Sequence, residues 1–141
     1  MSDPSPGDVI HLAYLWRREA EQGRTEGTKE RPCVVVLVDR ESTAGSRIVS
    51  VVPITHSLPR HPEGALELPP GTKRRLGLDE ARSWIVTSEL NRFTWPGYDL
   101  RRTPDGRERY GPLPHGQLRT LLKVIVEQAR GGDLVTVDRD E

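Results

Sequence analysis

The feature that most constrains this fold is a pair of apolar, β-branched runs that are too short for long amphipathic helices. Residues Pro32–Val38 read PCVVVLV, and residues Arg47–Thr55 read RIVSVVPIT. β-branched side chains favour the surface of a sheet, so both runs predict strands, and the first predicts a buried one. Pro53 lacks a backbone N–H, which predicts a sheet edge or a bulge near the end of the second run.

Further strands and turns are expected on either side of this pair. The 13 glycines and 12 prolines favour many turns and short strands over a helical bundle. Apolar or alternating segments predict three more strands: Val9–Trp16, Ala65–Leu68 and Ser83–Leu90. Turn-rich or charged segments predict the connections: a long flexible loop over Arg17–Arg31, a turn over Glu41–Ser46, a loop over Ser57–Gly64 that carries Arg60 and His61, and a turn with a short helix over Pro69–Leu78.

One long helix is expected near the C-terminus. Its apolar residues recur at helical spacing and draw a single stripe: Leu118, Leu121, Leu122, Ile125 and Ala129. Pro114 suits the start of this helix, and Gly131-Gly132 predicts its end. Several short strands followed by one helix predict a small, strongly bent antiparallel sheet or barrel closed by a C-terminal helix.

Composition excludes several classes of protein. No run approaches the ~18 apolar residues of a membrane-spanning helix, and MSDPSPGDVI does not resemble a secretory signal, so we expect a cytoplasmic protein. One cysteine, Cys33, excludes an internal disulfide, and four histidines without ligand spacing give no reason to expect a metal or another cofactor. The 21 basic and 21 acidic residues cancel, so composition alone does not predict nucleic-acid binding.

The order of motifs along the chain resembles the PemK/MazF family of toxins from bacterial toxin–antitoxin pairs. Residues Gly7–Ile10 open the first strand, a charged loop leads to Arg31-Pro32, and Val51–Thr55 reads VVPIT. Residues Ser83–Glu89 and then Tyr110-Gly111 precede the amphipathic helix. The length of 141 residues predicts a single domain over residues 1–141. Within it we expect residues 1–6 to be a loose lead-in and residues 131–141 a tail, and the resemblance implies that residues 7–130 form an SH3-like antiparallel β-barrel (PemK/MazF/CcdB-like) with its C-terminal helix.

The same resemblance implies an activity, partners and catalytic residues. It implies metal-independent cleavage of single-stranded RNA, a homodimer, and a cognate antitoxin that lies across the site. In the family's motif the Arg before Pro in the second strand is catalytic, as is the Thr or Ser that closes the third strand. These positions are Arg31 and Thr55.

The residue types fit this chemistry without the family. A ribose 2′-hydroxyl can attack the neighbouring phosphate, and an Arg guanidinium offers paired donors to the phosphate oxygens as charge develops. Pro32 stiffens the backbone beside Arg31, and Thr55 can orient the phosphate by a hydrogen bond. The general acid and base are left open between His56 and His11. His56 directly follows Thr55, so in an extended strand the two would point to opposite faces unless the chain bends.

Further residues are expected to contact RNA or a partner. The stretch Glu89-Leu90-Asn91 stands where many family members carry a Gln-x-Arg pattern, so the positive charge is missing there. The expected contacts are Arg17, Arg18, Arg24, Lys29, Ser57, Glu89 and Asn91. We expect Trp16, Trp84 and Trp95 to pack in the core, and Lys73-Arg74-Arg75 to form a solvated basic turn.

Two other functions remain open on the same barrel. One is a catalytically inactive module that binds a protein or peptide, which the neutral charge and Asn91 favour. The other is a gyrase-type inhibitor, because fold does not determine function. A dinucleotide enzyme or a metal-dependent hydrolase is not expected, since the sequence lacks G-x-G-x-x-G, Walker-type, H-E-x-x-H and G-x-S-x-G patterns.

Overall fold

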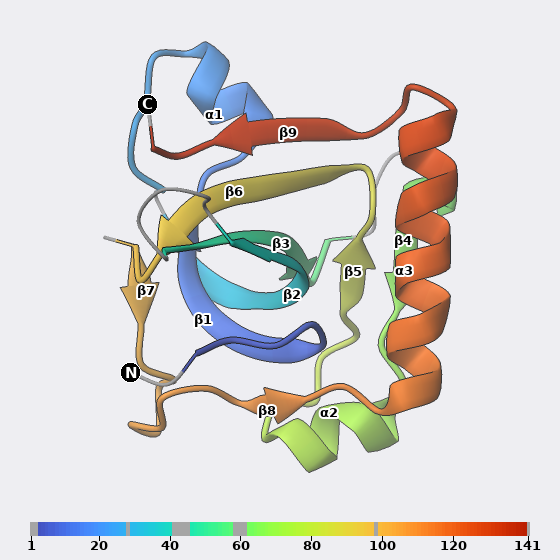
Figure 1. Ribbon diagram of the computed structural model, residues 1–141. Helices are drawn as coiled ribbons and strands as arrows, with labels where there is room; N and C mark the ends of the chain where they lie inside the picture. The colour runs from blue at the N-terminus through green and yellow to red at the C-terminus, as the bar shows by residue number, and fades with distance from the viewer. Residues whose placement is uncertain (1–2, 28, 41–45, 58–61, 98, 141) are drawn as a thin grey trace.

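The computed structural model describes residues 3–27, 29–40, 46–57, 62–97 and 99–140 (Figure 1). The strands are β1 (Asp8–Tyr14), β2 (Lys29–Arg40), β3 (Arg47–Thr55), β4 (Ala65–Glu67), β5 (Trp84–Val86), β6 (Glu89–Trp95), β7 (Leu100–Arg101), β8 (Gly111–Pro112) and β9 (Val135–Asp138). The helices are α1 (Arg17–Glu21), α2 (Pro70–Leu76) and α3 (His115–Arg130), with a 3₁₀ turn, η1, at Pro62–Gly64. No helix in the described part of the chain has the length and apolar content needed to cross a bilayer.

The nine strands form one bent sheet. Its central order is β4-β5-β3-β2-β1-β7, while β6 pairs with β3 and β9, and β8 pairs with β1. The expected mainly-β fold with a C-terminal helix is confirmed, but the expected barrel does not close. Among the described residues no ladder joins β4 or β9 to the edge formed by β7 and β8.

Strand β3 changes partners along its length. Its first part, Arg47–Val51, pairs with β6, whereas its last two residues, Ile54 and Thr55, pair with β5. Pro53 lies between these two ladders, where its missing N–H costs no bond to either neighbour. The expected single strand Ser83–Leu90 is therefore two strands, β5 and β6, because one serves each half of β3.

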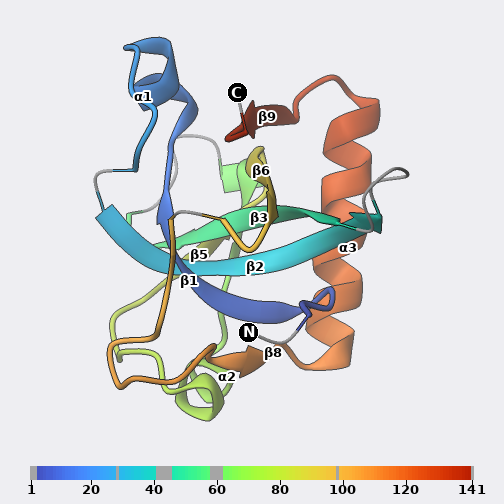
Figure 2. The same ribbon diagram turned by 60° about the vertical axis from the view of Figure 1, so that its left-hand side comes forward.

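The central strands are buried on both faces, which explains their continuous apolar runs. One face of β2 contributes Val34 and Val36 to a core that includes Leu121 and Ile125 of α3. The other face contributes residues such as Cys33 to a second core with Leu12, Tyr14, Phe93 and Trp95. Figure 2 shows α3 running alongside the sheet and covering the first of these cores.

Three segments differ from the sequence-based expectation. The expected flexible loop Arg17–Arg31 begins with α1 and ends inside β2. The C-terminal tail contains β9, which pairs in parallel with β6. In α2, Lys73 is 5% exposed rather than solvated. Residues 41–45 of the expected turn over Glu41–Ser46, and Arg60 and His61, lie outside the described residues.

Candidate functional site

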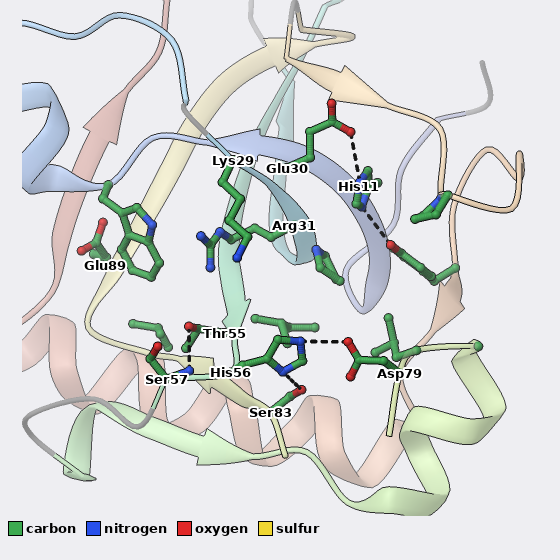
Figure 3. A pocket seen from close by; sticks show the side chains of 18 of the residues that line it. His11, Lys29, Glu30, Arg31, Thr55, His56, Ser57, Asp79, Ser83 and Glu89 are labelled. Atoms are coloured by element: carbon green, nitrogen blue, oxygen red, sulfur yellow. Dashed lines mark hydrogen bonds and ion pairs between the residues drawn. The ribbon is translucent and has the colours of Figure 1, made fainter. Parts of the chain in front are cut away.

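A wide pocket of about 1150 Å³ lies where several strands end (Figure 3). Its walls come from β1, α1, β2, the end of β3, the segment between α2 and β5, and the segment before β8. Arg31, Thr55, His56 and His11 all line it. The fold thus brings the four residues expected to carry the chemistry to one pocket.

Arg31 is a partly buried cation on the wall of the pocket. Among the described residues its side chain forms no ion pair, and its buried Nε has no hydrogen-bond partner. Burial lowers the pKa of the Arg31 guanidinium from its ordinary value, but an arginine stays protonated at neutral pH. The guanidinium carbon lies 5.1 Å from the centroid of the Trp16 ring, which supports the side chain by a cation–π contact. Such a group is ready to bind an anion.

Thr55 shares a sheet face with Arg31. The β2–β3 ladder pairs Cys33 with Pro53, and continuing this register by two residues places Arg31 opposite Thr55. Side chains directly opposite in an antiparallel pair share a face, so both point into the pocket. The Thr55 Oγ1 accepts a hydrogen bond from the Ser57 N–H at 3.2 Å, which leaves its own proton free to donate.

His56 lines the same pocket just beyond the end of β3. Continuing the β3–β5 register by one residue places His56 opposite Ser83, on the face of Ile54 rather than that of Thr55. The His56 Nε2 lies 2.8 Å from Asp79 Oδ2, and the Nδ1 lies 3.1 Å from the Arg82 carbonyl oxygen.

His11 lies on the other face of the β1–β2 ladder. The register pairs Leu12 with Arg31 and His11 with Pro32, so His11 and Arg31 project from opposite faces. The His11 ring bonds Tyr110 Oη at 2.8 Å through Nδ1 and Glu30 Oε1 at 3.2 Å through Nε2. Burial raises the pKa of Tyr110 to about 12, so its hydroxyl keeps its proton and donates to Nδ1, and Nε2–H donates to Glu30.

Acidification is expected to destabilise the protein in part through His11. Burial lowers the pKa of His11 below 6.5, although Glu30 opposes the shift. Between the lowered value and 6.5 the unfolded chain binds more protons, so stability present above about pH 6.5 is lost as the pH falls. The free energy of unfolding, measured by urea denaturation at about pH 7.5 and pH 5.5, should fall less for His11→Gln than for wild type. His115→Gln, at an exposed histidine, should keep the wild-type slope; equal slopes for all three proteins would contradict this role.

The remaining expected contacts divide between the pocket and other surfaces. Arg18, Lys29, Ser57 and Glu89 line the pocket. Burial raises the pKa of Glu89, despite the hydrogen bonds that it accepts from the Arg17 N–H and the Tyr14 hydroxyl, each at 3.1 Å.

Three of the expected contact residues lie off the pocket. Arg17 and Arg24 do not line it, and the Arg17 side chain pairs with Glu21 at 2.8 Å. Asn91 is fully buried; its Oδ1 accepts from the Leu15 N–H at 2.9 Å, and its Nδ2 donates to the Leu15 carbonyl at 2.7 Å. Asn91 therefore holds the backbone next to Trp16 from within the protein, where RNA does not reach it.

Sequence reasoning missed several residues of the site. Lys73, Asp79 and Ser83 surround His56, and Tyr110 with Glu30 brackets His11. Lys73 and Leu76 are three residues apart and lie on the buried side of α2, and this spacing could have predicted that Lys73 is buried. No feature of the sequence pointed to Asp79 or Glu30, because an acidic residue in a polar segment is ordinarily solvated. In the described part of the chain no three His, Cys, Asp or Glu side chains cluster as metal ligands.

Comparison with known proteins decides the family. A family model described as the PemK-like, MazF-like toxin of type II toxin–antitoxin systems matches residues 6–96, more than half of the chain. This protein belongs to that family. No curated protein matches the chain. The matched span of the toxin family includes Arg31, Thr55 and His56, but not Tyr110 or β9. Type II toxins act with an antitoxin partner, so membership of the family implies one here.

Proposed function

We propose that the protein is the toxin of a toxin–antitoxin pair and acts as a metal-independent endoribonuclease on single-stranded RNA. The observation that carries this proposal is Arg31, a partly buried guanidinium in the pocket that forms no ion pair among the described residues. Burying a cation is costly, and functional sites are where such groups concentrate.

In the proposed reaction the ribose 2′-hydroxyl attacks the adjacent phosphorus. Negative charge develops on the phosphoryl oxygens, and the paired donors of Arg31 stabilise it. The Thr55 hydroxyl, oriented by the Ser57 N–H, donates to one of these oxygens and orients the phosphate. The products are a 2′,3′-cyclic phosphate and a 5′-hydroxyl end.

The walls of the pocket support binding of a single strand. The guanidinium carbons of Arg18 and Arg31 lie 5.2 and 5.1 Å from the centroid of the Trp16 ring. Two guanidinium groups and one aromatic ring therefore lie together at one side of the pocket. Lys29 adds a third cation to the lining. We expect these three cations to bind RNA phosphates in the pocket, although the whole chain has no net charge.

The antitoxin would compete for the same groups. We propose that it presents an acidic segment, with carboxylates that pair with Arg31 and block the phosphate position. The proposal includes a homodimer, which light scattering of the purified protein tests, and action in the cytoplasm, where RNA is present.

Incubation with a mixed-sequence single-stranded RNA in the presence of EDTA tests the proposed function. We expect discrete cuts that leave 2′,3′-cyclic phosphate ends, because no step of the reaction uses a metal. An equal length of double-stranded RNA is the control substrate and should stay intact. Intact single-stranded RNA after treatment with folded, antitoxin-free protein would contradict the proposal and favour the alternative, a catalytically inactive binding module.

A further inference from the structure

A network of hydrogen bonds surrounds His56 on one wall of the pocket (Figure 3). We define the His56 network as His56, Lys73, Asp79 and Ser83. Asp79 binds His56 Nε2 at 2.8 Å through one oxygen and Lys73 Nζ at 2.9 Å through the other. Ser83 Oγ lies 3.1 Å from His56 Nδ1 and 2.7 Å from Lys73 Nζ. The four residues therefore form a closed ring of contacts.

Lys73 holds this network in place. Its side chain is 6% exposed, and its ammonium donates to Asp79, to Ser83 and to the Ala81 carbonyl oxygen. An ammonium has three protons, so all three are used and none is left without a partner. Burial alone would raise the pKa of Asp79, but the hydrogen bond from Lys73 and the neighbouring charges of His56 and Lys73 lower it. Asp79 is thus a carboxylate at neutral pH.

The partners of His56 favour a proton on each ring nitrogen. Nε2 faces the Asp79 carboxylate, which only accepts. Nδ1 faces the Arg82 carbonyl oxygen, which also only accepts. Ser83 donates its hydroxyl proton to the Ala81 carbonyl at 3.1 Å, so toward His56 it offers a lone pair. An imidazolium satisfies all of these acceptors, whereas a neutral ring leaves one of them unpaired.

The two sides of the ring differ in access. Nδ1 faces Ser83, which is 1% exposed, whereas Nε2 faces Asp79, whose side chain is 59% exposed. The His56 side chain itself is 51% exposed. Nε2 therefore lies on the exposed side of the ring, where its proton bonds Asp79 until a substrate oxygen takes it, and the buried side of the ring is held by Ser83 and the Arg82 carbonyl.

His56 also has the better position relative to Arg31. It directly follows Thr55, which lies opposite Arg31 when the β2–β3 register is continued. His11 is only 7% exposed, whereas the His56 side chain is 51% exposed. Of the two histidines left open by the sequence, His56 is the one beside the proposed phosphate position.

We propose that His56 is the general acid of RNA cleavage and that Asp79 and Lys73 are positioning residues that hold its ring in place. This inference rests on the proposed function. As the bond from the 2′-oxygen to phosphorus forms, the bond from phosphorus to the 5′-oxygen breaks, and the Nε2 proton moves to that leaving oxygen. The 2′-hydroxyl proton passes to water, and the neutral His56 then regains a proton from water. No electrons are exchanged with another molecule.

The charged groups around His56 come from several elements. Asp79 contacts the His56 ring directly, and Lys73 contacts Asp79. Strand β2 contributes two more cations to the pocket, Lys29 and Arg31. Charged and titratable groups of the same pocket include Asp79 of the segment after α2, Lys29 and Arg31 of β2, and Asp105 and Tyr110 before β8. Among the described residues, Asp79 is the carboxylate paired with the His56 ring.

An RNA oligonucleotide with sulfur in place of the bridging 5′-oxygen at the mapped cut tests the role of His56. A thiol has a pKa of about 8.5, so the sulfur leaving group departs as a thiolate without a proton donor. The ordinary oxygen leaving group is a much stronger base and needs a proton as it departs. His56→Gln should slow cleavage of ordinary RNA about 10²-fold or more and cleave the sulfur-containing RNA at nearly the wild-type rate. His115→Gln, at an exposed histidine outside the pocket, should cleave both as wild type does.

Cleavage of the same two RNAs tests the role of Asp79. Asp79→Asn removes the carboxylate that bonds His56 Nε2 at 2.8 Å, so it should slow cleavage of ordinary RNA more than cleavage of the sulfur-containing RNA. Glu67→Gln removes a carboxylate that pairs with Arg82 at 2.8 Å, so it should cleave both RNAs as wild type does.

The outcomes separate this inference from the proposed function. Wild-type protein that leaves both RNAs intact would contradict the nuclease itself. If wild type cuts RNA but His56→Gln slows both substrates equally, or leaves both rates unchanged, His56 is not the general acid and the nuclease stands. Equal losses on the two RNAs, or no loss on either, in Asp79→Asn would remove Asp79 from the mechanism.

Discussion

Arg31→Ala is expected to slow RNA cleavage about 10³-fold while the protein stays folded, because it removes the cation that stabilises the charge of the transition state. The loss should appear in kcat rather than in KM. Stability should change by no more than about 1 kcal/mol, since the guanidinium is held mainly by its cation–π interaction with the Trp16 ring. Arg31→Lys keeps the charge without the paired donors, so it should recover only part of the rate.

Arg18→Ala is the matched control for Arg31. Arg18 stacks on the same Trp16 ring, at 5.2 Å, and lines the same pocket. It is expected to contact RNA through one exposed phosphate, so its removal should cost about tenfold or less, mainly in KM. Equal losses in kcat for the two variants would show that the pocket needs positive charge in general, which would contradict the assigned role of Arg31.

Arg139→Ala is expected to lower the free energy of unfolding by about 3–5 kcal/mol, the typical effect of removing one partner from a buried ion pair. The Arg139 and Asp99 side chains are 6% and 16% exposed and form an ion pair. The Arg139 guanidinium also donates to Asn91 Oδ1 at 2.9 Å and to the Ala13 carbonyl oxygen at 3.2 Å. Its removal leaves Asp99 charged and largely buried. Urea denaturation measures the change.

Arg92→Ala provides the comparison within the same part of the sheet. Arg92 of β6 pairs with Asp138 of β9 at 3.2 Å, but the two side chains are 39% and 34% exposed. Solvent screens such a pair, so its removal should cost at most about 1 kcal/mol. A destabilisation by Arg139→Ala as small as that by Arg92→Ala would contradict a structural role for the buried pair.

The sequence predicted the elements that have strong local signals. Pro32–Val38 lies within β2 and Arg47–Thr55 is β3, because apolar β-branched residues specify buried strands with little ambiguity. The stripe on α3 and the short helix within Pro69–Leu78 were also found. Helix α1 was missed because it spans only five charged or small residues, and β9 because four residues after a glycine pair carry little pattern.

Only the site residues that belong to recognisable sequence motifs could be predicted. Arg31 and Thr55 stand in motifs that the sequence shows, and their placement in one pocket follows from the β2–β3 register. The partners of His56 could not be predicted, because Lys73 and Asp79 reach it from another segment through tertiary packing. Asn91 was expected at the surface, but its side chain pairs with the backbone of Leu15, a contact between residues 76 positions apart.

The wall of the pocket at Trp16 depends on a residue that is synthesised almost last, just after β9. Asn91, which holds the Leu15 backbone next to Trp16, is itself held by Arg139, 48 residues later in the chain. At an elongation rate of about 5–20 residues per second, translation takes about 2–10 s to cover that interval. A growing chain on the ribosome therefore contains the strands that line the pocket before it contains Arg139, which holds Asn91 against the Leu15 backbone. Products of broken messages that end before β9 lack that arginine permanently.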